Sequence, residues 1–489
     1  MTTFSQMSAG TNVGPPSLAM PRVGSSAETS LSALLQDLEL QREQRWMRGG
    51  QAAELKLHWR ASAIQHMLHL VPGESILELG AGSGLLTKQL DRILHGENAV
   101  TSVIFSPDLL SKAAARRLEG VTLVSGDSLR SIPAGQFDYV IGMGMLWHTG
   151  FAECQRWIHR VLKPGGQMLF FEPSFFWPSR VFNELHSREG ELKSQALELN
   201  RILEVFGETG FEQIEMTPHD IVSSRLGEHL MARVQAKALL LEHMPFVRRA
   251  CVSMYVLADK QGERAKPEPN LAEHPSLFGA VSVVVPAHNE AANIDHLVQS
   301  LLRCYGSYIH EIIIVNDNST DETAEVGRRL AMTEPRVRLV NRSKPNGVGL
   351  ALRDGYRAAT GKYILSMDCD FVKILPQLRS MFRVIAEGHD GAIGSRFSHD
   401  SILVNYPFAK LLCNRLCHLL IKLFLLDSPR DISNNLKLYR SDIFKEMQIS
   451  TPHFSANLET GLRALLAGYD IVEVPISWIN RTSEMGSST

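Results

Sequence analysis

A charged, proline-bearing stretch divides the chain into two halves of similar character. Residues 259–279, DKQGERAKPEPNLAEHPSLFG, show no hydrophobic periodicity, and an apolar run follows directly. On each side of this stretch, short apolar runs typical of β-strands alternate with helical patterns, which indicates α/β domains built on mostly parallel sheets. At 489 residues, the chain is also too long for one ordinary hydrophobic core. We therefore expect two doubly wound α/β domains, at 31–258 and 280–489, with 259–279 as a linker.

The composition limits the class of protein. A hydrophobic share of 44% and a charged share of 21% are those of a soluble globular chain. A net charge of −2 gives no electrostatic reason to expect nucleic acid as a partner. The six cysteines form no C-x-x-C pair, which favours reduced thiols in a cytoplasmic protein.

The N-terminal residues 1–30 are rich in Ser, Gly, Thr and Pro and lack the apolar core of a signal peptide. We predict a disordered leader there. The sequence has no uninterrupted apolar run of about 18 residues, so we expect no transmembrane helix.

The first half contains a glycine-rich turn between a strand and a helix. In ESILELGAGSGLLTKQL, residues 74–90, Gly80, Gly82 and Gly84 allow a tight bend and a close approach of the backbone to a nucleoside. The start of the next helix offers free N–H groups. A tight turn without a ligand, as in any α/β protein, is the alternative interpretation.

Further phrases follow this turn in a set order: VTLVSGDSL, FDYVIGMGMLWH, CQRWIHRVLKPGG, QMLFFEP, GFEQIEM and VSMYVLADK. Over roughly residues 40–260 the set resembles the class I S-adenosylmethionine-dependent methyltransferases. The resemblance implies a Rossmann-like methyltransferase fold with S-adenosylmethionine as cofactor. It places Glu78 and the three glycines of the turn around the methionine part of the cofactor, and Asp127 near its adenine.

One position departs from that family. Many members end the second strand with an acid that binds the ribose hydroxyls, whereas this strand ends in Ile104 and Phe105. Asp108 lies nearby but fits the first turn of the next helix, where the helix dipole favours a carboxylate. The departure predicts weak cofactor binding or a domain without catalysis. His148 is a candidate general base for a methyl acceptor, and a structural loop histidine is the alternative.

The second half places polar residues at three strand ends. The apolar runs of AVSVVVPAHNE, EIIIVNDNSTDET and KYILSMDCDF each lead into carboxylates or amides. The last of them carries Asp368 and Asp370, one residue apart. Because open α/β sheets bind ligands at the carboxyl ends of their strands, we expect these groups to meet at one edge.

These phrases, with NGVGLALRDG, GSRF, RDISNNLKLYR and ETGLRALLAGYDIVEVPI, resemble the family 2 glycosyltransferases of the inverting GT-A type. Among them, the dolichyl- or polyprenyl-phosphate sugar transferases are the most similar group. The resemblance implies a GT-A fold and a nucleotide-sugar donor. It also implies that Asp368 and Asp370 form a D-x-D site for Mg²⁺ or Mn²⁺, because hard oxygen ligands suit these ions. By the same resemblance, Pro286, Glu290 and Asp317 would hold the base and ribose of the donor, and Asp368 would contribute to donor binding at the diphosphate.

The type of acceptor remains open between two chemistries. A polyprenyl phosphate is already an anion and needs cations, for which Arg396, Arg440 and Arg481 are candidates. A hydroxyl acceptor on a glycan or small molecule needs a general base, for which Glu459 is the candidate. Asp370 and Arg396 belong to the predicted catalytic set in either case.

A helical window at 407–427 bears on the same question. Lys410, Asn414, His418 and Lys422 recur every four residues on an otherwise leucine-rich helix. A polar stripe opposite a broad apolar face suits a helix lying at a membrane surface, so we expect peripheral contact with the inner face of a membrane. A helix packed on the core of its own domain is the alternative.

The sequence therefore predicts a bifunctional enzyme. The C-terminal domain would transfer a sugar from a nucleotide-sugar to a polyprenyl phosphate, and the N-terminal domain would transfer a methyl group to a related acceptor. The alternative is a glycosyltransferase with a hydroxyl acceptor, joined to a methyltransferase-like scaffold without catalysis.

Overall fold

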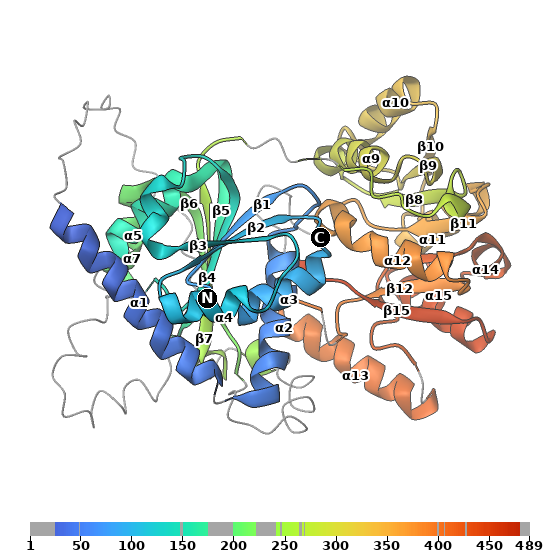
Figure 1. The fold of residues 1–489 in the computed structure, drawn as a ribbon. Helices are drawn as coiled ribbons and strands as arrows, with labels where there is room; N and C mark the ends of the chain where they lie inside the picture. The colour runs from blue at the N-terminus through green and yellow to red at the C-terminus, as the bar shows by residue number, and fades with distance from the viewer. Residues whose placement is uncertain are drawn as a thin grey trace.

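The computed structural model describes most of the two predicted domains. The described residues are 25–47, 49–146, 150–174, 199–221, 241–244, 247–263, 267, 269–398, 401–404, 406–425 and 428–479. Two seven-stranded sheets lie side by side, each covered by helices (Figure 1). The predicted fold class, two doubly wound α/β domains, is confirmed.

The first sheet has the order β3-β2-β1-β4-β5-β7-β6. Its strands are parallel except β7, which runs antiparallel to β5 and β6. The central strands are buried on both faces, which explains their continuous apolar composition. The strands are β1 (Ser75–Leu79), β2 (Ala99–Ile104), β3 (Val121–Ser125), β4 (Phe137–Met143), β5 (Leu162–Pro173), β6 (Phe211–His219) and β7 (Ser253–Lys260).

The helices of the first domain cover both faces of this sheet (Figure 1). The first helix begins at Ser25, inside the segment predicted as a disordered leader, and buries Leu31 and Leu35 against the domain core. Residues 1–24 lie outside the described residues. The helices are α1 (Ser25–Met47), α2 (Gly50–Met67), α3 (Leu85–Leu94), α4 (Pro107–Ala114), α5 (Phe151–Val161) and α7 (Leu199–Thr209), with the 3₁₀ segments η1 (Gly126–Ser131) and η3 (Val247–Ala250).

The second sheet has the order β10-β9-β8-β11-β14-β12-β15. It is parallel except for β14, which is inserted antiparallel between β11 and β12. A short pair, β13 with β16, lies apart from it. The strands are β8 (Val281–Ala287), β9 (Ile309–Asn316), β10 (Val337–Asn341), β11 (Tyr363–Ser366), β12 (Gly391–Ser395), β13 (Leu403–Val404), β14 (Lys437–Arg440), β15 (Ile471–Pro475) and β16 (Trp478–Ile479).

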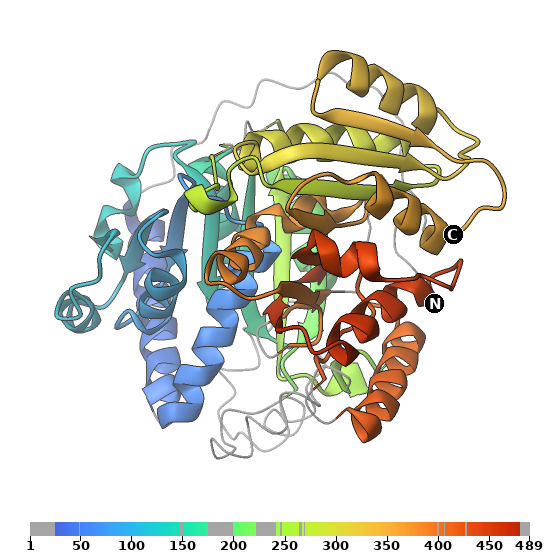
Figure 2. The same ribbon diagram turned by 90° about the vertical axis from the view of Figure 1, so that its right-hand side faces the viewer.

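Helices pack on both faces of this sheet as well, whereas α13 lies away from it (Figures 1 and 2). Among the helices of the described residues, none combines the length and the apolar composition needed to cross a membrane. The helices are α9 (Ala291–Tyr305), α10 (Thr323–Thr333), α11 (Val348–Ala358), α12 (Leu378–Ala386), α13 (Phe408–Phe424), α14 (Ser441–Glu446) and α15 (Ser455–Leu466), with η4 (Pro275–Leu277) and η5 (Phe371–Gln377).

Parts of the segment 259–279, predicted as a linker, belong to the two domains. Leu271 and Leu277 are buried in the core of the second domain, and β7 continues to Lys260. Across the domains, Arg379 of α12 donates two hydrogen bonds of 2.7 Å to the carboxylate of Glu97. The pair of Arg379 and Glu97 therefore joins the two domains.

Candidate functional site

The two carboxylates of MDCDF follow the carboxyl end of β11. Both Asp368 and Asp370 are half-buried there. Burial, and then the negative charges of Asp370 and Glu290, raise the pKa of Asp368 to about 6, although Asn435 and Arg396 oppose the rise. Neighbouring carboxylates repel each other when both are ionised, and a cation between them relieves that repulsion.

A buried chain of hydrogen bonds orients Asp368. The side-chain amide of Asn435 donates to Asp368 Oδ1 at 2.7 Å. Ser366 donates to Asn435 Oδ1 at 2.8 Å, and the Tyr356 hydroxyl donates to Ser366 Oγ at 2.9 Å. Sequence reasoning missed Asn435, and the only available signal was an amide in RDISNNLKLYR just before a strand.

The predicted donor-binding residues lie at the ends of β8 and β9. Asp317 accepts hydrogen bonds from Arg342 and from the backbone N–H of Gly347, the latter at 2.6 Å. Glu290 precedes α9 and lies close enough to Asp368 to raise its pKa. The carbonyl of Pro286 accepts a contact of 3.6 Å from the thiol of Cys369, in the middle of MDCDF. The structure therefore brings Pro286, Glu290 and Asp317 to the edge that carries the aspartate pair.

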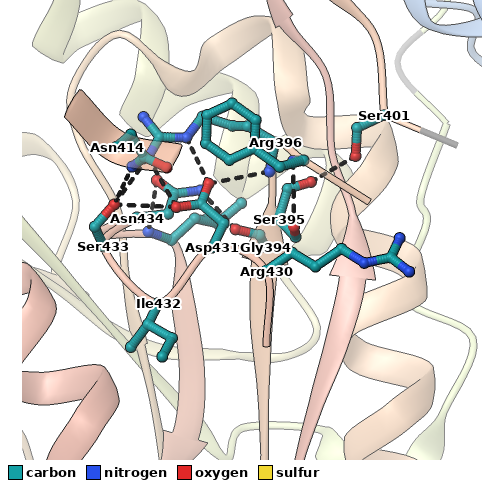
Figure 3. Close-up of polar contacts among 12 residues, drawn as sticks. Gly394, Ser395, Arg396, Ser401, Asn414, Arg430, Asp431, Ile432, Ser433 and Asn434 are labelled. Atoms are coloured by element: carbon teal, nitrogen blue, oxygen red, sulfur yellow. Dashed lines mark hydrogen bonds and ion pairs between the residues drawn. The ribbon is translucent and has the colours of Figure 1, made fainter. Parts of the chain in front are cut away.

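Arg396, directly after β12, makes a buried ion pair with Asp431 (Figure 3). Its Nε donates to Oδ2 at 2.7 Å and its Nη2 to Oδ1 at 3.0 Å. The guanidinium also lies over the rings of Tyr406 and Trp478. Burial would raise the pKa of Asp431, but Arg396 outweighs that effect and lowers it. A fork of this kind fixes the orientation of both groups.

Helix α13 holds the loop that contains Asp431. The amide of Asn414 donates to Ser433 Oγ at 2.8 Å (Figure 3). His418, buried at 3% exposure, accepts the backbone N–H of Ile432 on Nε2 at 2.9 Å. Two members of the predicted polar stripe therefore face the protein. The leucine-rich face points outward instead, with Leu416, Leu419, Leu420, Leu423 and Phe424 all exposed.

One residue that was predicted to bind phosphate is not brought to the aspartate pair. Arg440 was predicted to bind phosphate, but β14 is antiparallel to β11, so Arg440 pairs with Tyr363 at the opposite end of β11 from Asp368. Arg440 makes an ion pair with Asp390 at 2.8 Å instead. The same register places Lys437 beside Ser366. Lys437 is therefore the basic residue of β14 at the edge that carries the aspartate pair. Its burial lowers its pKa to about 7.

Glu459 is engaged with a neighbouring loop. Its carboxylate accepts hydrogen bonds from the hydroxyls of Ser450 and Thr451, at 2.8 and 2.7 Å, and from their backbone N–H groups. Burial alone would raise the pKa of Glu459, but these bonds and one from Arg463 lower it to about 2. A carboxylate in this state is a weak base. His148 and Arg481 lie outside the described residues.

The glycine turn of the first domain has the predicted backbone shape. Gly80, Gly82 and Gly84 have φ of +68°, +62° and +75°, which only glycine adopts easily. The carboxylate of Glu78 is turned into the protein, where it accepts hydrogen bonds from Thr87 at 2.6 Å and Ser102 at 3.0 Å. Asp127 is exposed in η1, after β3.

The space over this turn is filled by the chain itself. A Cβ built on Gly82 would lie 2.5 Å from Glu43 Oε2 and 3.1 Å from Arg42 Nη2, both on α1. Side chains of α1 therefore lie against the turn, at the place where the resemblance puts the cofactor.

Within the described residues, no three Asp, Glu, His or Cys side chains are grouped so that they could hold a metal ion. Asp368 and Asp370 do fit the way Mg²⁺ is usually bound, by one or two carboxylates together with substrate phosphates and water.

Comparison with known families agrees with both predicted resemblances. Residues 282–448 match the family model of glycosyl transferase family 2, and residues 76–166 match that of a methyltransferase domain. The glycosyltransferase match covers the aspartate pair and the Arg396–Asp431 ion pair. The methyltransferase match covers the glycine turn and Asp127.

Three curated relatives are similar to 40–42% of the chain. Glycosyltransferase AglD of Haloferax volcanii is 29% identical over 205 residues, which is 33% of its length. Dolichol-phosphate mannosyltransferase of Pyrococcus furiosus is 26% identical over 56% of its length. Polyprenol monophosphomannose synthase of Mycolicibacterium smegmatis is 27% identical over 79% of its length. The chain thus spans about a third to about half of the first two relatives.

Two solved structures show weaker likeness. Glucosyl-3-phosphoglycerate synthase from Mycobacterium tuberculosis has a TM-score of 0.36 at 16% identity, over 45% of this chain and 79% of that one. Phosphoethanolamine N-methyltransferase 2 from Haemonchus contortus has a TM-score of 0.31 at 19% identity, over 42% of this chain and 52% of that one. Because these scores are low, the family models carry the assignment. The chain combines a methyltransferase domain with a glycosyl transferase family 2 domain.

Proposed function

We propose that the second domain transfers a sugar from a nucleotide-sugar to a polyprenyl phosphate, with inversion. The observation that carries this proposal is the position of Asp368 and Asp370 beside the loop held by Arg396 and Asp431. Two of the three relatives are named for transfer to dolichol phosphate or for synthesis of a polyprenol phosphosugar. The family model supports the class of reaction.

Asp368 and Asp370 would hold Mg²⁺ or Mn²⁺ through their carboxylate oxygens. A cation held there would neutralise the charge of the departing nucleoside diphosphate. Asn435 keeps Asp368 oriented for this role through its 2.7 Å hydrogen bond. Glu290 and Asp317, at the ends of the neighbouring strands, would position the nucleoside of the donor.

Three arginines near Asp431 support an anionic acceptor. Arg396, which follows β12, Arg415 of α13 and Arg430 lie around the carboxylates of Asp431 and Glu473. Figure 3 shows the Arg430 side chain extending away from Asp431. A phosphate acceptor is already ionised and needs such cations rather than a base. The low pKa of Glu459 disfavours the alternative in which it activates a hydroxyl acceptor.

Helix α13 would bring the domain to the membrane that holds such a lipid. Asn414 and His418 hold the loop that contains Asp431, and Leu416, Leu419, Leu420 and Leu423 are exposed. Lys410 and Lys422 are exposed on the same helix, where they can meet anionic headgroups. Peripheral contact with the inner face of the membrane is thus part of the proposal.

For the first domain we propose methyl transfer from S-adenosylmethionine to a product of the same pathway. The methyltransferase family model and the glycine turn support this role. A scaffold without catalysis remains the second candidate, because Ile104 ends β2 and Phe105 follows it, where an acid would contact the ribose.

The main test of the glycosyltransferase uses the full chain with a panel of nucleotide sugars, Mn²⁺ or Mg²⁺ and a short polyprenyl phosphate. We expect a glycosyl-phosphoryl lipid by mass spectrometry, and at least a 100-fold lower rate for Asp370→Ala because the leaving diphosphate loses its cation. Asp295→Asn, an exposed carboxylate on α9, is the control. Transfer to a glycan with the lipid left untouched would contradict the proposal.

The aspartate pair also predicts a pH-dependent change in stability. Because the pKa of Asp368 is raised to about 6 in the folded protein, its contribution to stability is lost as pH rises from about 4 to about 6. Asp370→Asn relieves this repulsion and should stabilise the metal-free protein at pH 8 by on the order of 1 kcal/mol, with a smaller gain at pH 5.

Thermal melting with and without Mn²⁺ measures this effect. Mn²⁺ should raise the melting temperature of the wild type and of Asp295→Asn, but not that of Asp370→Asn. An equal Mn²⁺ shift in all three proteins would mean that the ion binds elsewhere.

Glu459→Gln separates the two acceptor chemistries. We expect the variant to keep the rate and the pH profile of sugar transfer to polyprenyl phosphate, because this acceptor needs no base. Its melting temperature should fall, because the amide cannot accept all the hydrogen bonds from Ser450 and Thr451. A rate that collapses in a correctly folded variant, with loss of the acidic limb of the pH profile, would instead favour a hydroxyl acceptor.

The exposed face of α13 predicts binding to lipid vesicles. Flotation with anionic vesicles should recover the wild type but not Leu419→Glu/Leu423→Glu, whose side chains are 58% and 69% exposed. Leu466→Glu on α15, at 68% exposure, is the matched control and should float like the wild type. Equal flotation of all three proteins would place the membrane contact elsewhere.

A further inference from the structure

Three charged residues of α1 reach the carboxyl edge of the first sheet. Glu39, Arg42 and Glu43 are spaced i, i+3 and i+4, so they share one face of the helix. They are buried, with exposures of 0%, 9% and 7%. Asp37 and Arg45 on the same helix are exposed. The buried face of α1 is therefore charged at the place where a helix normally presents apolar side chains.

Glu39 binds three backbone donors from two strand ends. Its Oε1 accepts the N–H of Gly82 in the glycine turn at 3.0 Å. Its Oε2 accepts the N–H groups of Phe105 and Ser106, directly after β2, at 3.0 and 2.9 Å. The carboxylate thus joins the two loops between which a nucleoside would lie.

Arg42 and Glu43 engage the remaining polar groups of the edge. Arg42 donates to the carbonyl of Gly80 and, at 2.8 Å, to that of Met143 at the end of β4. Glu43 accepts the hydroxyl of Ser83. A Cβ on Gly82 would lie only 2.5 Å from the Oε2 atom of Glu43.

These contacts use the groups that a ligand needs. In open α/β sheets, ligands bind at the carboxyl ends of strands through backbone N–H and C=O groups of this kind. Here the backbone groups at the ends of β1, β2 and β4 make hydrogen bonds with side chains of α1. Glycine at position 82 leaves room for a close approach, and a side-chain carboxylate occupies that room.

We propose that α1 occupies the cofactor site of the first domain and competes with S-adenosylmethionine for it. Cofactor binding then requires Glu39, Arg42 and Glu43 to leave the strand ends. This inference rests on the proposed function, in which this domain binds S-adenosylmethionine. It differs from a role of Glu39 as the acid missing after β2, because such a ligand would strengthen cofactor binding rather than oppose it.

Calorimetric titration of the full chain with S-adenosylhomocysteine tests the competition. Glu39→Gln and Arg42→Gln should bind the probe at least fivefold more tightly than the wild type and should melt at lower temperature without it. Asp37→Asn and Arg45→Gln, on the exposed face of α1, are the charge-matched controls and should behave like the wild type. Weaker or equal binding by folded Glu39 and Arg42 variants would overturn the proposal.

Hydrogen–deuterium exchange on the wild type keeps the test independent of how the variants fold. Addition of the probe should increase exchange in residues 31–47 and decrease it in residues 80–84. Protection of both segments would mean that α1 closes over the cofactor, which contradicts competition. If neither the wild type nor any folded variant binds the probe, the cofactor assignment itself fails, and the competition fails with it.

Discussion

The buried ion pair between Arg396 and Asp431 is the contact on which the polar centre of the second domain depends. It joins the end of β12 to the loop before β14, and that loop carries Asn435 to Asp368. Because both charges are buried, loss of either partner would leave the other uncompensated, at a cost of about 3–5 kcal/mol. The orientation of the aspartate pair is therefore coupled to a contact on the far side of β14.

The same loop links the aspartate pair to α13. His418 and Asn414 hold the backbone of Ile432 and the hydroxyl of Ser433. A displacement of α13 would therefore reach the loop directly. This arrangement connects the exposed apolar surface of α13, the loop that contains Asp431 and the carboxylate pair, as the proposed lipid-phosphate acceptor would require.

The two sheets differ in what surrounds the polar groups at the carboxyl ends of their strands. In the second domain the carboxylates of Asp368 and Asp370 repel each other, and their charge is suited to a cation. In the first domain the polar groups of the strand ends are satisfied by Glu39 and Arg42 of α1. The backbone groups at the end of a strand can thus be bonded by a helix of the same chain. A glycine turn in the sequence does not tell whether these groups are bonded in this way.

The sequence alone determined the two α/β domains, the glycine turn and the placement of Asp368 and Asp370 at a strand end. These features follow from local periodicity and from residues adjacent in the chain. Tertiary structure decided which residues meet across the fold. The antiparallel insertion of β14 moved Arg440 to the far edge and brought Lys437 near the site. The packing of α13 turned His418 inward, whereas Leu416, Leu419, Leu420 and Leu423 point outward. The packing of α1 delivered Glu39 to strand ends that lie more than forty residues away in the chain. Strand register and helix orientation depend on the whole packed core, and local patterns do not encode them.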